Sequence, residues 1–239
     1  MSLSHGVSTV NDAIILHLDA ANKRSYPGTG TTWSDISGNG NNCNLFNAPV
    51  YSSVNNGFFS FDGTNDMGVA PASLKWSANG SIGYQTMTID MWVNSSDTSG
   101  KLISKPWNGS GQYNYWIDPS RFLLEVTSGS AQINFARNVC NGTWTNIVCW
   151  MGATNFGYYI NGNEYSGSAA HSLTGAAPSV GDRNLSCAIM TQYPYGDGWA
   201  GNASFSTLGN LATCKIYNRV LSHSEVLKNF NALRGRFGV

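Results

Sequence analysis

The sequence is poor in charged residues, and this scarcity argues against several kinds of partner. Lys, Arg, Asp and Glu together make up 11% of the 239 residues, and the formal net charge is zero. In an average soluble domain about a quarter of the residues are charged. No basic run is present, so binding to nucleic acid or to an anionic membrane surface gains no support. We therefore expect no nucleic-acid partner.

Long apolar stretches and paired cysteines are also missing. No apolar run reaches the length that spans a bilayer, and the first residues lack the charged and apolar regions of a secretory signal. We therefore expect no membrane insertion. The five cysteines include no Cys-x-x-Cys pair. Their odd number and apolar surroundings predict buried thiols in a protein made in a reducing cytosol.

Glutamate is scarce, and this bears on catalysis. The chain has three, Glu125, Glu164 and Glu225. A glycosidase needs two placed carboxylates, and no strand carries closely spaced acidic residues that would supply them. A Gly-x-Ser-x-Gly nucleophile elbow is absent as well. We therefore expect that the protein is not an enzyme.

Short alternating strands are what the sequence has in abundance. In Met87–Asn94, Met and aliphatic residues alternate with Thr, Asp, Trp and Asn, as in a strand with two different faces. Similar runs recur at short intervals, over 13–19, 58–61, 101–105, 113–118, 122–127, 132–136, 144–150, 157–160 and 211–217. Short, regularly spaced strands between Gly- and Asn-rich turns predict an all-β, antiparallel β-sandwich.

Turn and cap signals complete this expectation. Asn161-Gly162 predicts a type I′ hairpin turn. Ser222 and Glu225 have the spacing of a capping box, and the apolar stripe that follows predicts a short C-terminal helix. Gly235 is expected to end this helix. We expect an N-terminal arm over 1–12 and one sandwich domain over 13–239, because no repeat or linker is visible.

Two polar loops carry the most distinctive patterns, Trp33–Asn42 and Phe61–Asp66. The first is rich in Gly, Asn and Asp, so its backbone can bend sharply while side-chain oxygens come close together. Such oxygen clusters suit Ca²⁺, and we predict a structural ion held by Asp35, Asn39 and Asn41, with Asp66 as a further ligand. The alternative is that these side chains close the loop by bonding its own backbone.

The same two loops, in this order, resemble those of the laminin-G-like (LamG type 3) branch of the concanavalin A-like lectin/glucanase superfamily. The stretches Leu18–Asn22, Ser25–Gly30 and Asn231–Gly238 resemble the form found in tailed-phage virion proteins. The resemblance implies a concanavalin A-like jelly roll. It also implies a non-enzymatic virion protein of the head, tail fibre or baseplate.

Partners and location follow from that resemblance. We expect contacts with other virion proteins, a homo-oligomer or multi-copy assembly, and binding to host-surface polysaccharide during attachment. The location implied is the virion, assembled in the host cytoplasm. The alternative is a carbohydrate-binding module or a glycan-degrading enzyme of the same superfamily.

Aromatic loop residues are the candidate sugar platforms. They occur in two stretches, Trp107–Trp116 and Tyr193–Trp199. The residues that we predict to bind a ligand are Trp107, Tyr113, Tyr193, Tyr195, Asp197 and Trp199. Each ring could instead fill the interior, where aromatic residues dominate packing.

Overall fold

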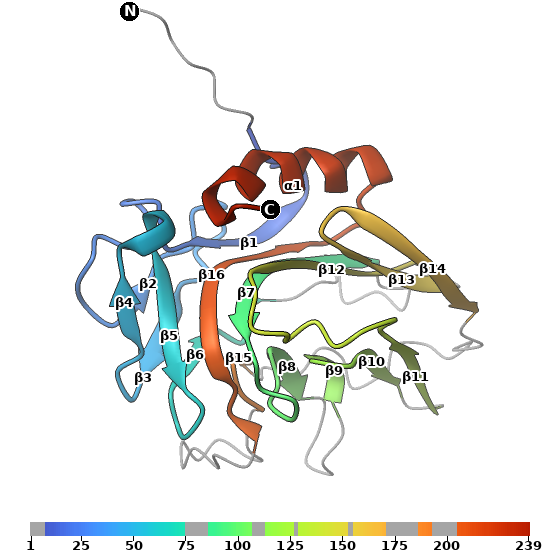
Figure 1. Cartoon of the computed structure of the whole chain (residues 1–239), viewed down its shortest axis with the longest axis horizontal. Coiled ribbons are helices and arrows are strands. Elements are labelled where there is room, and N and C mark those ends of the chain that lie inside the picture. The colour runs from blue at the N-terminus through green and yellow to red at the C-terminus, as the bar shows by residue number, and fades with distance from the viewer. Residues whose placement is uncertain are drawn as a thin grey trace, which may run out of the picture.

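The computed structural model confirms an all-β, jelly-roll sandwich with one C-terminal helix (Figure 1). It describes residues 8–74, 86–106, 113–126, 129–152, 155–170, 186–192 and 205–239. Two antiparallel sheets form two layers, and the helix α1 (His223–Phe237) lies across the outer face of one of them. None of the helices in these ranges has the length and apolar character needed to span a bilayer.

The sheet beneath α1, called sheet A, has the strand order β14-β13-β12-β7-β16-β5-β4, with β1 also paired to β16. Its strands are β1 (Ile14–Asp19), β4 (Val50–Ser52), β5 (Phe58–Asp62), β7 (Met87–Ser95), β12 (Thr145–Met151), β13 (Asn155–Ile160), β14 (Asn163–Ala170) and β16 (Leu208–Tyr217).

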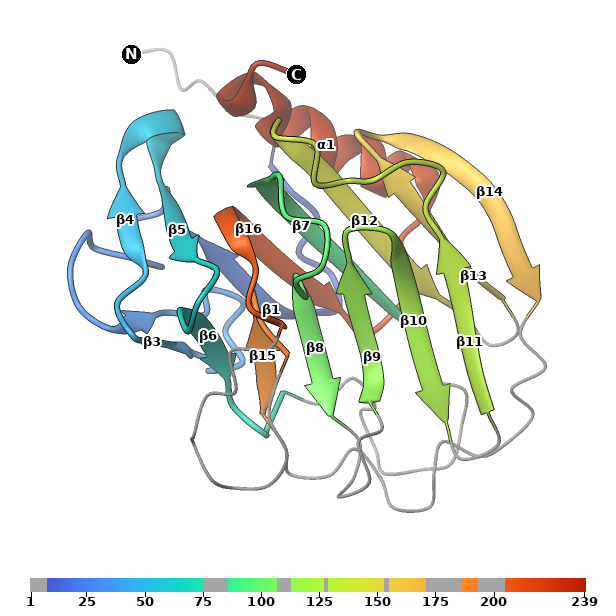
Figure 2. The same ribbon diagram turned by 60° about the horizontal axis from the view of Figure 1, so that its bottom comes forward.

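The opposite sheet, called sheet B, has the order β11-β10-β9-β8-β15-β6-β3-β2. Its strands are β2 (Thr32–Trp33), β3 (Cys43–Phe46), β6 (Met67–Ala70), β8 (Ile103–Pro106), β9 (Tyr113–Asp118), β10 (Arg121–Val126), β11 (Gly129–Asn134) and β15 (Cys187–Ile189). Figure 2 shows β8 to β11 side by side as one meander. The short strands β2, β3, β4, β6 and β15 were not predicted individually, because each has only two to four residues.

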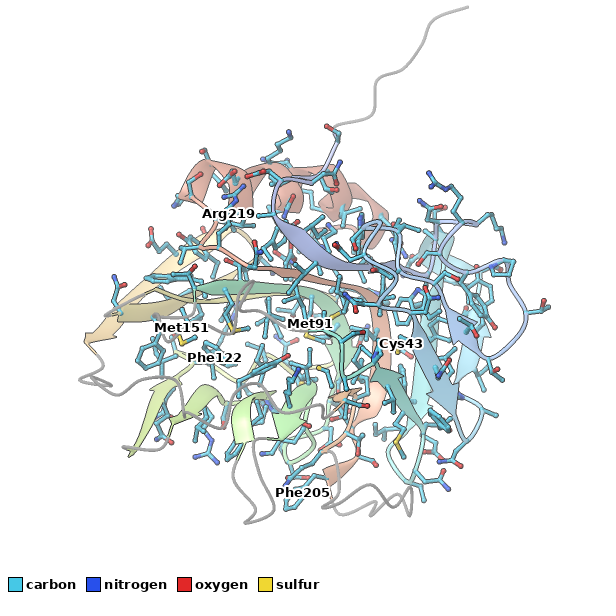
Figure 3. The ribbon with its side chains drawn as sticks, turned by 180° about the vertical axis from the view of Figure 1, so that it is seen from behind. Cys43, Met91, Phe122, Met151, Phe205 and Arg219 are labelled. Atoms are coloured by element: carbon cyan, nitrogen blue, oxygen red, sulfur yellow. The ribbon has the colours of Figure 1, made fainter. Side chains whose placement is uncertain are left out.

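The core lies between the sheets, as the alternation of β7 predicts. Met87, Ile89, Met91 and Val93 are fully buried in it. In Figure 3, Met91 of sheet A and Phe122 of sheet B both lie in the layer between the sheets. Trp92 lies on the other face of β7 and stacks against α1 instead. Each face of this central strand is therefore covered by a different layer.

The helix begins at the predicted capping box. Ser222 Oγ accepts from the backbone N–H of Glu225, whose carboxylate accepts from the backbone N–H of Ser222 (2.8 Å). Arg219 adds a bidentate ion pair to the same carboxylate, with a 2.6 Å contact. The predicted helix end was wrong: the helix continues through Gly235, and Gly238 ends it in the left-handed conformation (φ 70°).

Between α1 and sheet A lies a buried layer of polar side chains. Asp90 accepts hydrogen bonds from Asn146 Nδ2 (2.8 Å) and Asn229 Nδ2 (3.0 Å). Lys215 lies directly opposite Asp90 in the register and is 1% exposed, and its Nζ has no hydrogen-bond partner among the described residues. Burial lowers the pKa of Lys215. The charges of Asp90 and Asp19 act in the opposite direction, because each favours the protonated amine.

An arginine holds the end of α1 to the turn that joins β4 to β5. The guanidinium of Arg236 donates to the backbone oxygen of Asn55 (2.6 Å), to that of Gly57 and to Asp19 Oδ1 (2.8 Å). Asn55, Asn56 and Gly57 all have positive φ angles, and in this turn the carbonyls of Asn55 and Gly57 both face the guanidinium. A planar fork of donors suits such a set of oxygens.

Candidate functional site

The Trp33–Asn42 loop is organised around one carboxylate, that of Asp35. Its Oδ1 accepts from the backbone N–H groups of His17 (2.8 Å) and Ser37 (2.9 Å). Its Oδ2 accepts from Ser37 Oγ (2.7 Å) and the backbone N–H of Asn41 (3.0 Å). An ionised carboxylate offers about four lone-pair positions, so these four donors occupy them all. Asp35 thus fastens the loop to itself and to β1.

The two predicted asparagine ligands have the same kind of role. Asn39 Nδ2 donates to the backbone oxygen of Ile14 (2.9 Å), and Asn41 Nδ2 donates to that of Ile15 (2.8 Å). Asn41 Oδ1 accepts from Ser73 Oγ (3.1 Å). The loop contacts therefore match the alternative interpretation, in which these side chains close the loop by bonding the backbone.

Asp66, the fourth predicted calcium ligand, lies in a separate turn. It is next to Met67, which pairs with Phe46 at one end of β3, whereas Trp33 pairs with Cys43 at the other end. Asp66 Oδ2 accepts from the backbone N–H of Asp62 (3.1 Å), and burial raises the pKa of Asp66. Asp66 thus belongs to a turn at the opposite end of β3 from the Trp33–Asn42 loop.

Acidic and other metal-binding side chains elsewhere in the described part of the chain bear on the same prediction. Among the described residues, no three His, Cys, Asp or Glu side chains come together in a way that could hold a metal ion. Calcium binding stays a prediction, and removal of the ion from the purified protein tests it.

One local pattern explains how four of the aspartates are used. In Asp-x-Ser/Thr triplets, the aspartate oxygen accepts from the backbone N–H two residues later, which closes a tight turn. This happens at Asp35, Asp62, Asp97 and Asp118, and Asn141 does the same before Thr143. The triplets are visible in the sequence, so this role could have been predicted for each of them.

The predicted aromatic ligand residues cannot be placed. Trp107, Tyr193, Tyr195, Asp197 and Trp199 lie outside the described residues, as does the side chain of Tyr113. The backbone of Tyr113 begins β9.

The outer face of sheet B carries a different aromatic and charged group, which we call the Trp116 patch. Trp116 pairs with Ser104 and Leu123 in the sheet, while its neighbours Tyr115 and Ile117 point into the core. Trp116 is therefore directed away from the core. The patch consists of Lys101, Trp116, Asp118, Arg121, Gln132 and Phe205.

Lys101 is the centre of the patch. Its Nζ lies 3.1 Å from Asp118 Oδ2, 5.0 Å from the centroid of the Trp116 ring and 5.5 Å from that of Phe205. Its backbone N–H donates to the Phe205 oxygen (2.9 Å). A cation near two ring faces is attracted by both. Lys101 thus holds the segment before β16 against β9 and β10, and Figure 3 shows Phe205 on the side of the molecule opposite α1.

Asp118 and Arg121 complete the charged part. Burial acts to raise the pKa of Asp118, but the Ser120 backbone N–H and the charge of Lys101 outweigh it and lower that pKa. Arg121 Nε donates to Asp118 Oδ2 (3.1 Å), and Arg121 Nη1 donates to Gln132 Oε1 (3.1 Å). The side chain of Arg121 is 36% exposed, and Phe205 is 43% exposed. A ring and a guanidinium are therefore both open to solvent.

The described acidic groups show no pair placed for hydrolysis. Glu225 is occupied by the helix cap and Arg219, and Glu164 contacts His223 Nδ1 (3.3 Å). Asp90 is buried under α1, away from the Trp116 patch. The side chain of Glu125 lies outside the described residues. All five cysteines are buried and none forms a disulfide, which confirms the prediction of buried thiols.

Sequence reasoning missed the Trp116 patch. Its members come from four separate segments, and no local motif joins them. The available signal was Trp116 at an outward position of a strand, directly before the Asp118–Ser120 turn and Arg121.

Comparison with known proteins gives the relatives of this fold. The family model described as "Concanavalin A-like lectin/glucanases superfamily" matches residues 69–227. No curated protein matches the chain. Three solved structures that it resembles are 14–15% identical to it and so inform on the fold alone.

These three structures illustrate the likeness. The binding domain of Paraclostridial Mosquitocidal Protein 1 has a TM-score of 0.65 at 15% identity, covering 93% of this chain and 52% of that one. The receptor binding domain of botulinum neurotoxin D has 0.65 at 14% identity, covering 95% and 53%. Domain 4 of AbnA, a GH43 extracellular arabinanase from Geobacillus stearothermophilus in complex with arabinotriose, has 0.62 at 15%, covering 92% and 98%. The chain thus spans about half the length of the toxin binding domains.

Proposed function

This chain belongs to the concanavalin A-like lectin/glucanases superfamily, and we propose that it is a non-enzymatic recognition module that binds a cell-surface polysaccharide. The observation that carries the proposal is the Trp116 patch. It combines exposed ring surface with a few oriented polar groups, which is the usual composition of a site for a small ligand or a sugar unit. The rings of Trp116 and Phe205 supply apolar faces, and Arg121 and Gln132 supply hydrogen bonds.

The non-enzymatic part of the proposal is supported by how the described carboxylates are used. Glycoside hydrolysis needs one carboxyl group as acid and a second as nucleophile or base. In the Trp116 patch the carboxylate is Asp118, and it is committed to Lys101, Arg121 and the Ser120 turn. Release of reducing sugar ends by the purified protein would contradict this part.

The finer proposal concerns where the module works. We propose that it is a component of a tailed-phage particle, present in several copies and in contact with other virion proteins, where it attaches the particle to host polysaccharide. The support is the sequence resemblance of Leu18–Asn22, Ser25–Gly30 and Asn231–Gly238 to virion proteins. Five buried cysteines that form no disulfide also suit assembly in a reducing host cytoplasm.

Direct binding tests both levels of the proposal. Purified protein is titrated with polysaccharide extracted from candidate host cells, and separately with particles that have been stripped of it. We expect saturable polysaccharide binding that weakens about tenfold or more, a loss of about 1.4 kcal/mol, in Phe205→Ser and Trp116→Ala. Val54→Ser is the matched control, because Val54 is an exposed apolar residue (63%) in the turn near the C-terminal end of α1.

Each outcome has a definite meaning. Binding to polysaccharide that the Phe205 and Trp116 substitutions leave unchanged would overturn the site. Binding to particles alone would make the protein a structural component and overturn the recognition role. Binding to polysaccharide alone would leave the recognition module standing and overturn the virion placement.

A further inference from the structure

We infer that the Trp116 patch selects an acidic saccharide, with Arg121 as the residue that pairs with the carboxylate of a uronic or similar acidic sugar. This inference rests on the proposed function and narrows it to a class of ligand. It is carried by three features of the described residues: the charge balance of the patch, the free donors of Arg121, and the rigidity with which that side chain is held.

The charges of the patch do not cancel. Lys101 and Arg121 are cationic, and Asp118 is the acidic member. The side chains of Lys101 and Asp118 are 9% and 7% exposed, so this ion pair is largely shielded from solvent. Arg121 is 36% exposed, and its charge is the one that a ligand can reach. Because the whole chain has zero net charge, attraction for an acidic ligand has to come from such a local group.

The guanidinium of Arg121 keeps donors available. Its Nε–H is bonded to Asp118 and one Nη1–H to Gln132, while the other N–H groups have no partner among the described residues. A guanidinium matches a carboxylate with two parallel hydrogen bonds, which are stronger and more directional than neutral ones. The remaining N–H groups of Arg121 are therefore suited to an oxyanion, whereas a neutral sugar could accept hydrogen bonds from them but would bring no opposite charge.

Arg121 is also held in place before any ligand arrives. Asp118 and Gln132 fix two of its nitrogens, and its Cζ lies 5.8 Å from the centroid of the Trp116 ring. Side-chain freedom that is already lost does not have to be lost on binding. A sugar whose ring contacts Phe205 or Trp116 can then place its carboxylate against the guanidinium of Arg121, which is already oriented.

Chemical reduction of the ligand tests the inference. Polysaccharide from candidate host cells is used as extracted and after its carboxyl groups have been reduced to alcohols, which keeps the sugar backbone and removes the charge. We expect reduction to abolish binding, and we expect affinity for the untreated polymer to fall as salt rises, because the charge pair is solvent-exposed.

Substitutions assign the effect to Arg121. Arg121→Gln is expected to weaken binding of the untreated polymer about tenfold or more, and Arg121→Lys to restore part of it, because lysine keeps the charge without the fork. Arg24→Gln removes the same charge from a distant exposed position and should leave affinity unchanged. Equal melting temperatures of the three variants would exclude a folding effect.

The experiments distinguish failure of the proposed polysaccharide binding from failure of the acidic specificity. If no polysaccharide binds, the proposed function fails, and the inference fails with it. If the reduced polymer binds as well as the untreated one, or if Arg121→Gln binds as the wild type does, the module still recognises a polysaccharide and the acidic specificity is overturned.

Discussion

Substitution of Asp35 gives the sharpest test of how the Trp33–Asn42 loop is held. The carboxylate accepts four hydrogen bonds, from His17, Ser37 (two) and Asn41. A net contribution of about 1 kcal/mol for each bond gives a loss of about 4 kcal/mol for Asp35→Ala. For a domain of this size about 1 kcal/mol shifts the melting temperature by 2–4 °C, so a fall of about 10 °C is expected.

Asp35→Asn tests the hydrogen bonds by themselves, because asparagine keeps the size of the side chain and replaces one acceptor oxygen with an NH₂ group. Its Oδ1 can still accept from the His17 and Ser37 N–H groups, but its Nδ2 would face the N–H of Asn41. We therefore expect about half of the alanine effect. Thermal unfolding followed by circular dichroism measures both variants beside the wild type.

The same experiment with EDTA distinguishes hydrogen bonding by Asp35 from calcium binding by Asp35. If Asp35 acts by bonding the backbone, EDTA leaves the wild-type melting temperature unchanged. A fall in the wild type that is reversed by Ca²⁺ and missing in Asp35→Ala would refute the reasoning. If Asp35→Ala lowered the free energy of unfolding by less than about 1 kcal/mol, the reasoning would also be refuted, because four hydrogen bonds of usual strength contribute more than that.

Three further predictions concern α1 and its contacts. Lys215→Met should remove a pH dependence of stability. Burial lowers the pKa of Lys215, so wild-type stability should rise between that lowered pKa and the usual 10.5, where the unfolded state binds more protons, and urea unfolding across this range should show no such rise in the variant. Glu225→Gln should make the free energy of unfolding less dependent on pH between 4.5 and 2, as measured by urea unfolding. The hydrogen bond from Arg219 lowers the pKa of Glu225 to about 2, so the stabilisation by this carboxylate is present above pH 4.5 and is lost toward pH 2. Arg236→Lys should lower stability by about 2 kcal/mol in urea, since an ammonium cannot reach the Asn55, Gly57 and Asp19 oxygens together.

The sandwich could be predicted from the sequence because its main signals are local. The alternation in Met87–Ser95, the positive φ angles of Asn161 and Gly162, and the capping box at Ser222 are each decided within a few residues. Strands as short as Val50–Ser52 and Cys43–Phe46 have no such signature, since they form only because longer neighbours offer pairing partners.

The candidate sites depend on contacts between distant residues, and these were predicted less well. Asp35 closes its loop partly through the backbone of His17, on a strand that no spacing rule connects to it. In the same way, Lys101 and Phe205 meet at Trp116 only after the sheets have formed. Oxygen-rich composition alone could not distinguish a metal site from a loop closed by hydrogen bonds to its backbone, because both use the same side chains.

The position of β16 in sheet A has a consequence for biosynthesis. This strand pairs with β1, β5 and β7, yet a ribosome makes its residues after those of every other strand of the sheet. The nascent chain must therefore carry three strands whose shared partner does not yet exist, while the β8–β11 meander can pair soon after it emerges. Until Leu208–Tyr217 leaves the exit tunnel, the open edges of β1, β5 and β7 are where association with other chains or with a chaperone would occur.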